Sequence, residues 1–265
     1  MIGVADRLVA DGHTLSGVYS FPCDQVFNFN DKIMDMAAYH AVPFIQTPIT
    51  VHDIAAHIDD GVTCFLSLGY PFKIPTIDEG KAYGINMHPS YLPKARGLMP
   101  TPTILMHEPE AAGVTIHKIT SHFDAGDILA QKRVAISNTD TVDTYSAKIA
   151  LIVPDMMSAM CADLPAVWQN AVPQDESQAT YAPMPDDALR TLDFNRDDVD
   201  TIDAKGRAFG RYGVLAQVNG ACVTITEYAV WKDKHDIDFG TCVLSSPAQM
   251  VVAVKGGYMM ILKNT

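Results

Sequence analysis

The chain has 265 residues, of which 48% are apolar and 19% charged, and its formal net charge is −12 at pH 7. This composition is that of a globular protein with enough length for one large or two small domains. The charge argues against a nonspecific nucleic-acid surface, which needs clustered Lys and Arg. No apolar run is long enough to span a membrane and no signal-peptide pattern opens the chain, so we expect a cytoplasmic protein without a membrane partner.

Helical and extended patterns alternate along the first 70 residues. Helices are expected at residues 3–10, 31–39 and 50–58, and strands at residues 14–21, 44–46 and 63–70. Such alternation predicts an α/β fold with a doubly wound, mostly parallel sheet and right-handed crossovers. A strand should precede the first helix in such a sheet, and none does. We therefore expect a missing first strand or a late start, with a gap or an unpaired edge beside the strands at 14–21 and 63–70.

A polar pair closes the next expected strand, which begins at Gly84. Asn86 and His88 are two residues apart, so both side chains point to the same face of the strand. Pro89 lacks a backbone donor and ends the strand. The pair is thus expected at the carboxyl end of a strand, where open α/β sheets place their ligands. An amide and an imidazole alone are more often a hydrogen-bonding pair than a catalytic one.

A carboxylate lies in the loop between two further expected strands, at residues 113–119 and 128–136. Gly126 permits a tight turn that would aim Asp124 toward the polar pair. An amide, an imidazole and a carboxylate together suit acyl transfer, because they can bind an oxyanion, move a proton and orient the imidazole. His117, on the first of these strands, is expected to be a packing residue.

The sequence pattern changes from residue 140 onward. A long helix is expected over residues 140–161, and residues 170–195 are rich in Pro, Gln, Asp and Ala, which predicts a surface linker. A helix over residues 197–208 precedes five short strands. These strands are expected at residues 214–218, 222–228, 241–244, 250–254 and 258–262. Together they predict a small OB-like β domain, with a hairpin at Asn219-Gly220.

Three patterns in order resemble those of the formyltransferases that use N10-formyltetrahydrofolate. They are N-x-H-P-S-x-L-P-x-x-R-G from Asn86, G-V-T-I-H from Gly113 and D-A-G-D-I-L from Asp124. The resemblance implies an N-formyltransferase in which Asn86, His88 and Asp124 are catalytic, with N10-formyltetrahydrofolate as the donor and no metal. It also implies a catalytic domain at residues 1–168, a linker at 169–196 and an abbreviated C-terminal OB-like domain at 197–265.

The same resemblance implies where the two substrates bind. The folate-binding candidates are Tyr70, Pro71, Phe72, Ile74, Phe123 and Asp124. Pro71 stands where relatives have Gly, which removes a backbone donor from the pterin pocket. The acceptor-binding candidates are Ser90, Lys94 and Arg96. A turn-forming Ser90 and a solvated Lys94 are the alternatives, and Arg96 is expected to fix the loop next to the acceptor entrance.

The acceptor is predicted from charge. Residues 22–31 match a basic insertion of methionyl-tRNA formyltransferases, yet they hold two Asp and no Lys or Arg, and residues 170–195 hold five acidic residues and one Arg. Since phosphate contacts dominate tRNA affinity, we expect no nucleic-acid partner. We expect a small or carrier-linked primary amine, such as a nucleotide-linked amino sugar, on which Phe27 and Phe29 could stack. The C-terminal domain would then be a lid or a homodimer surface.

Three alternatives remain open for the function. The acceptor could be methionyl-tRNA, the donor could be hydrolysed by water, or the chain could bind folate without activity. Formate release without an amine would favour the second alternative, and folate binding without turnover would favour the third.

Overall fold

The computed structural model describes residues 2–23, 30–218 and 220–264. By its contacts the chain forms two compact units. Unit 1 comprises Met1–Pro100, Glu110–Ala135 and Ser146–Ala182, and unit 2 comprises Thr101–Pro109, Ile136–Tyr145 and Pro183–Thr265. None of the described helices combines the length and apolarity that a membrane crossing needs. Phe27 and Phe29, together with most of the segment at residues 22–31, lie outside the described residues.

Unit 1 holds the first elements of the chain. They are α1 (Ile2–Ala10), β1 (Val18–Tyr19), α2 (Asp31–Tyr39), β2 (Phe44–Ile45), α3 (Val51–Asp59), β3 (Cys64–Leu68), β4 (Tyr83–His88), β5 (Gly113–Lys118), β6 (Ile128–Arg133), most of α5 (Val142–Cys161), α6 (Leu164–Gln169) and the 3₁₀ turn η2 (Glu176–Gln178). Local sequence explains several boundaries. Thr50 and Asp53, for example, form a capping box that starts α3.

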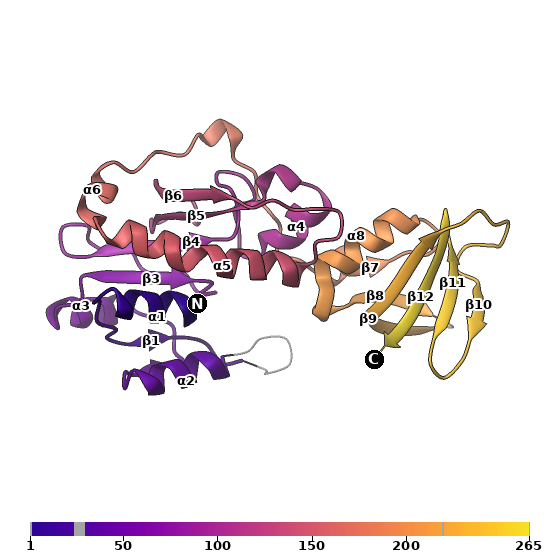
Figure 1. Ribbon diagram of the computed structural model, residues 1–265, viewed down its shortest axis with the longest axis horizontal. Helices are drawn as coiled ribbons and strands as arrows, with labels where there is room; N and C mark the ends of the chain where they lie inside the picture. The colour runs from indigo at the N-terminus through magenta and orange to yellow at the C-terminus, as the bar shows by residue number, and fades with distance from the viewer. Residues whose placement is uncertain (1, 24–29, 219, 265) are drawn as a thin grey trace. The chain divides into compact units, whose positions relative to one another are not determined.

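The strands of unit 1 form two hydrogen-bonded sheets. β1 pairs with β2 in parallel, and the second sheet has the order β3-β4-β5-β6 (Figure 1). The predicted α/β class with parallel pairing is confirmed, since β3 and β4 also run parallel. β5 and β6 are antiparallel to their neighbours, so the sheet is mixed. The short loop at residues 119–127 allows this, because only parallel neighbours need a long crossover.

The expected gap in the sheet is present. Within the described ranges, β1 pairs only with β2, and β3 pairs only with β4. β1 is also shorter than the strand predicted at residues 14–21. Each of these strands therefore presents one edge without a strand partner in the described part of the chain.

Unit 2 contains the remaining elements. They are α4 (Pro100–Met106), α7 (Asp187–Arg190), β7 (Thr191–Leu192), α8 (Val199–Phe209), the 3₁₀ turn η3 (Gly210–Tyr212), β8 (Val214–Val218), β9 (Ala221–Lys232), β10 (Cys242–Ser245), β11 (Met250–Val254) and β12 (Gly257–Asn264). Pro100, the first residue of α4, belongs to unit 1. Of the 3₁₀ turn η1 (Pro109–Ala111), only Pro109 belongs to unit 2. The strands form one sheet of the order β10-β11-β12-β9-β8-β7. Val218 pairs with Ala221, which confirms the predicted hairpin. Closure into an OB-like barrel stays a prediction.

The core of unit 2 lies between α8 and this sheet. Buried side chains of α8, such as Ile202 and Phe209, pack with Ile225, Val252 and Met259 of the strands. The first two residues of the predicted helix at 197–208 instead precede α8, where the Asp198 side chain accepts a hydrogen bond from Thr201 N and caps the first turn. α8 thus joins the unit through one apolar face.

Candidate active site

Three polar side chains converge at the carboxyl end of β4. Asn86 and His88 lie on this strand, and Asp124 lies in the loop after β5. The Asp124 Oδ1 atom is 3.3 Å from Asn86 Nδ2 and 3.5 Å from His88 Nδ1. The predicted convergence of the amide, the imidazole and the carboxylate is therefore confirmed.

The backbone of the Asp124 loop is held in an unusual conformation. Asp124 has a φ of +53°, in the left-handed region, which costs a residue with a side chain about 1–2 kcal/mol. A Cβ at Gly126 would lie 2.0 Å from the carbonyl oxygen of Lys118, so only glycine fits there. The Gly97 N–H donates to Asp124 Oδ2 at 2.9 Å. Contacts from outside the loop thus stabilise a carboxylate position that the loop alone would not favour.

His117 belongs to the same cluster, and the expectation of a plain packing residue is wrong. Its ring is 2% exposed, and its Nε2 atom lies 3.0 Å from Asn86 Nδ2 and 3.5 Å from Asp124 Oδ1. Its Nδ1 atom lies 2.9 Å from the carbonyl oxygen of Lys118, which can only accept, so Nδ1 donates there and Nε2 faces the Asn86 amide and the Asp124 carboxylate. His117 therefore orients Asn86. Cross-strand pairing of Asn86 with His117 in β4 and β5 is the signal that could have revealed this.

The hydrogen bonds of His88 define its tautomer. Nε2 lies 2.9 Å from the carbonyl oxygen of Ala95, which can only accept, so Nε2 carries the hydrogen. Nδ1 then faces Asp124 Oδ1. Burial lowers the pKa of His88, and the negative charge of Asp124 offsets this only in part. The ring is thus neutral near pH 7, and a proton taken up at Nδ1 would be stabilised by Asp124.

Asp124 is ionised in this setting. Burial raises the pKa of its carboxyl group, but the His117 and His88 rings and the Gly97 N–H outweigh that effect, and the pKa lies below its ordinary value. A charged carboxylate therefore stands beside two imidazoles. Such an arrangement can hold or pass a proton.

Two of the three acceptor-binding candidates, Ser90 and Arg96, are buried. Ser90 Oγ donates to the carbonyl oxygen of Lys94 at 2.7 Å, and Ser90 has no exposed surface. Arg96 is 1% exposed and donates to Gln174, Glu176 and Tyr181. Lys94 remains partly exposed, with its Nζ 3.8 Å from Glu110. Only Lys94 can thus meet an acceptor without rearrangement.

The first part of the expected linker is packed onto the site loops. Thr180 O accepts from Arg96 N at 2.9 Å, Arg96 O accepts from Ala182 N at 2.8 Å, and Val172 pairs with Ile128. We call residues 174–182 the strap. The bonds between Arg96 and the strap join residues more than 80 positions apart, and neither they nor the pairing of Val172 could be read from the Pro- and Gln-rich composition of the segment.

Arg96→Met is expected to destabilise the protein. The substitution removes charge-assisted hydrogen bonds between the loop and the strap, and we expect the free energy of unfolding to fall by about 2 kcal/mol. Urea unfolding followed by tryptophan fluorescence measures this. Lys232→Met is the control, because its ion pair with Asp200 is exposed to solvent and is expected to contribute little to stability. Equal midpoints for the two variants would contradict the prediction.

The folate-binding candidates divide into packed and exposed side chains. The Tyr70 hydroxyl accepts from Ile49 N at 3.0 Å, and Tyr70 and Ile74 pack against a core cluster around Ile49. Phe72 is 38% exposed and contacts Tyr70 edge-on, while Phe123 is 54% exposed. Two rings, one on each loop, are therefore accessible to a pterin. Pro71, between Tyr70 and Phe72, is partly exposed.

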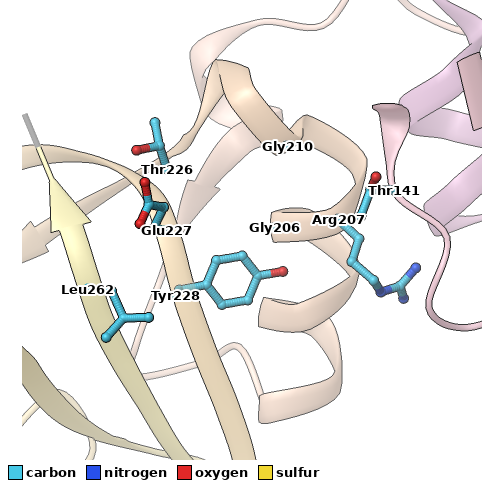
Figure 2. Close-up of a pocket in the computed structure, with 8 residues that line it drawn as sticks. All are labelled: Thr141, Gly206, Arg207, Gly210, Thr226, Glu227, Tyr228 and Leu262. Atoms are coloured by element: carbon cyan, nitrogen blue, oxygen red, sulfur yellow. The ribbon is translucent and has the colours of Figure 1, made fainter. Parts of the chain in front are cut away.

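A separate cavity of about 360 Å³ lies in unit 2 (Figure 2). It is lined by Thr141, Gly206, Arg207, Gly210, Thr226, Glu227, Tyr228 and Leu262. Figure 2 shows the Tyr228 ring pointing toward α8 beside Gly206. None of the predicted site residues lines this cavity. The cluster around His88, rather than this cavity, carries the groups that acyl transfer needs and is the candidate active site.

No group of three or more His, Cys, Asp or Glu side chains among the described residues is arranged to hold a metal ion.

Part of the chain matches a known protein family. Residues 75–160 match the family model described as formyl transferase. This part of the chain belongs to the formyl transferase family. The matched segment contains Asn86, His88 and Asp124, so the cluster lies within the part that the family shares.

Curated relatives and solved structures extend the formyl transferase match. The chain is 29% identical over 201 residues to a methionyl-tRNA formyltransferase of Lactiplantibacillus plantarum, which covers 72% of this chain and 63% of that one. It is 29% identical over 222 residues to the enzyme of the same name from Thermotoga maritima, covering 78% and 68%. The chain thus spans about two thirds of the length of these relatives.

Among solved structures, an N-formyltransferase from Helicobacter canadensis matches with a TM-score of 0.67 and 16% identity, over 100% of this chain and 95% of that one. That structure is a complex with folinic acid and dTDP-3-aminofucose. At this identity the likeness shows a shared fold.

Proposed function

We propose that this protein transfers the formyl group of N10-formyltetrahydrofolate to a primary amine at the Asn86, His88 and Asp124 cluster. The observation that carries the proposal is the convergence of these three side chains within the segment that matches the formyl transferase family. In this reaction the amine nitrogen bonds to the formyl carbon, the bond from that carbon to N10 breaks, and the proton that the amine loses is taken up by N10.

Each residue has a distinct part in this proposal. Asn86 Nδ2 carries two hydrogens, and its longer contact is the one of 3.3 Å to Asp124. The hydrogen of that contact can turn to the formyl oxygen as negative charge develops on this oxygen. The neutral His88 takes the amine proton, directly or through a water. Asp124 stabilises the imidazolium that forms. Catalytic hydrogen bonds of this kind are often long in the absence of substrate and shorten when it binds.

A nucleotide-linked amino sugar is the acceptor class that we propose. The charge of −12 disfavours a polyanionic acceptor, whereas Lys94 can meet a single diphosphate. The related fold from Helicobacter canadensis was solved with such a sugar nucleotide. Methionyl-tRNA is the second candidate, because the curated relatives over most of this chain are methionyl-tRNA formyltransferases.

The test is a transfer assay with N10-formyltetrahydrofolate and a panel of amines, followed by mass spectrometry of the product. We expect a formamide on at least one nucleotide-linked amino sugar. Formate release that does not depend on any amine would show hydrolysis instead. Folate binding without either product would show an inactive binding protein.

Asp124→Asn is expected to change both the rate and its pH dependence. The carboxylate raises the pKa of His88 against the effect of burial, so its loss lowers that pKa further. We expect the rate to rise with pH through the pKa of His88, the acid limb of the variant to lie at lower pH, and its plateau to fall by about 10²-fold or more. A pH–rate profile measures both effects.

Asp127→Asn is the matched control for this experiment, because Asp127 lies in the same loop but outside the cluster. Its Oδ2 atom is 3.8 Å from Lys118 Nζ. Its profile should follow that of the unchanged protein. An acid limb of Asp124→Asn that stays in place or moves to higher pH would contradict the assigned role.

A further inference from the structure

Gln174, in the strap, uses every hydrogen-bonding atom of its side-chain amide. The Nε2 atom lies 2.8 Å from the carbonyl oxygen of Asp124 and 2.7 Å from that of Gly126. The Oε1 atom lies 2.8 Å from Arg96 NH2 and 3.2 Å from Arg96 Nε. One side chain thus bridges the loop that carries Asp124 and the buried guanidinium.

The chemistry of its partners fixes the orientation of this amide. The backbone carbonyls can only accept and Arg96 can only donate, so the NH₂ group must face the Asp124 loop and the oxygen must face Arg96. The Arg96 guanidinium donates in turn to Glu176 Oε1 at 2.7 Å and to the Tyr181 hydroxyl at 3.1 Å. The strap and the site loop therefore share one hydrogen-bond network. If the Gln174 amide were flipped, its NH₂ group would face the donors of Arg96 and its oxygen would face the backbone carbonyls.

We propose that Gln174 is a positioning residue that keeps the Asp124 carboxylate directed at His88. It binds the carbonyls on either side of Ala125, at the point where Asp124 has its φ of +53°. Gly97 N–H holds the carboxylate itself, and Gln174 holds the backbone that carries it. The expected loss of transfer rate rests on the proposed function, whereas the expected movement of the Asp124 carboxylate does not.

Gln174→Glu is the substitution that tests the idea most narrowly. The glutamate keeps an oxygen for Arg96 and removes only the two donors, so a carboxylate oxygen then faces two carbonyl oxygens. The Asp124 loop should relax and move its carboxylate away from His88. Gln174→Ala, which removes the donors without adding repulsion, is the second variant in case the first fails to fold. Gln178→Glu, an exposed change of the same kind in the same strap, is the control.

The first readout is the titration of His88 in histidine-labelled protein by NMR, which needs no activity. The charged and titratable groups around His88 are Asp124, His117 and Arg96, and of these only Asp124 raises its pKa, as does the hydrogen bond to the Ala95 carbonyl. We expect the pKa of His88 to fall in Gln174→Glu and Gln174→Ala, while the His235 resonance of unit 2 stays unchanged. A merely structural role would lower the melting temperature without this selective shift.

The second readout is the transfer rate. We expect kcat to fall about 10- to 100-fold in both Gln174 variants, with the KM for the folate donor unchanged. If no amine is formylated by the unchanged protein, the proposed function fails, yet a shifted His88 would still support the positioning role. If both Gln174 variants match Gln178→Glu in the titration of His88, the positioning role is refuted.

Discussion

Replacement of His88 or Asn86 by Ala is expected to lower kcat about 10²–10³-fold while the dissociation constant of the folate donor changes little. Both side chains act at the point where charge and a proton move in the reaction, so their loss affects the transition state more than the bound substrates. The pterin is expected to contact other groups, such as the exposed rings of Phe72 and Phe123. Steady-state kinetics and folate titration measure the two quantities separately.

His52→Ala is the control for this experiment, because His52 is exposed on α3 and takes no part in the cluster. Its kcat should equal that of the unchanged protein. Turnover near normal in either His88→Ala or Asn86→Ala would refute the role assigned to that residue. Loss of folate binding in a variant with a normal fold would instead show that the residue binds the folate donor.

The second large effect concerns the acceptor. We expect formylation of charged initiator tRNA to be slower by orders of magnitude than formylation of a nucleotide-linked amino sugar. Docking an acceptor stem means neutralising several phosphates, and each contact needs a nearby Lys or Arg. Residues 1–60 hold eight acidic and only two basic residues, and residues 170–195 hold five acidic residues and one Arg. The net charge of −12 also slows the approach of a polyanion.

Initial rates at low and moderate salt decide between the two acceptors. Any residual tRNA rate should drop steeply with salt, whereas the rate with the sugar nucleotide should change little. A dedicated methionyl-tRNA formyltransferase provides the reference. A tRNA rate equal to that of the reference would overturn the charge argument and establish the second candidate.

Local patterns were enough to predict the core of the site. The period of two along β4 places Asn86 and His88 on one face, and Pro89 ends the strand at the right residue. Gly126 predicts the tight loop that brings Asp124 close. These inferences succeed because strand alternation and turn chemistry are properties of a few neighbouring residues.

The contacts that were not predicted depend on pairing between distant segments. His117 joins the cluster only because β5 pairs with β4 in the register that opposes Asn86 to His117. Arg96 is buried because the strap, some 80 residues later, folds back over it. No periodicity or composition signal encodes either contact. β7 is only two residues long and was missed for the same reason.

A crystal of the protein soaked with a formyltetrahydrofolate analogue that cannot transfer its group is the most direct test of the central claim. We predict density for the pterin beside Phe72 and Phe123, with the formyl oxygen within hydrogen-bonding distance of Asn86 Nδ2 and the formyl group next to His88. Folate bound in the cavity of unit 2, or anywhere without contact to Asn86, His88 and Asp124, would contradict the claim.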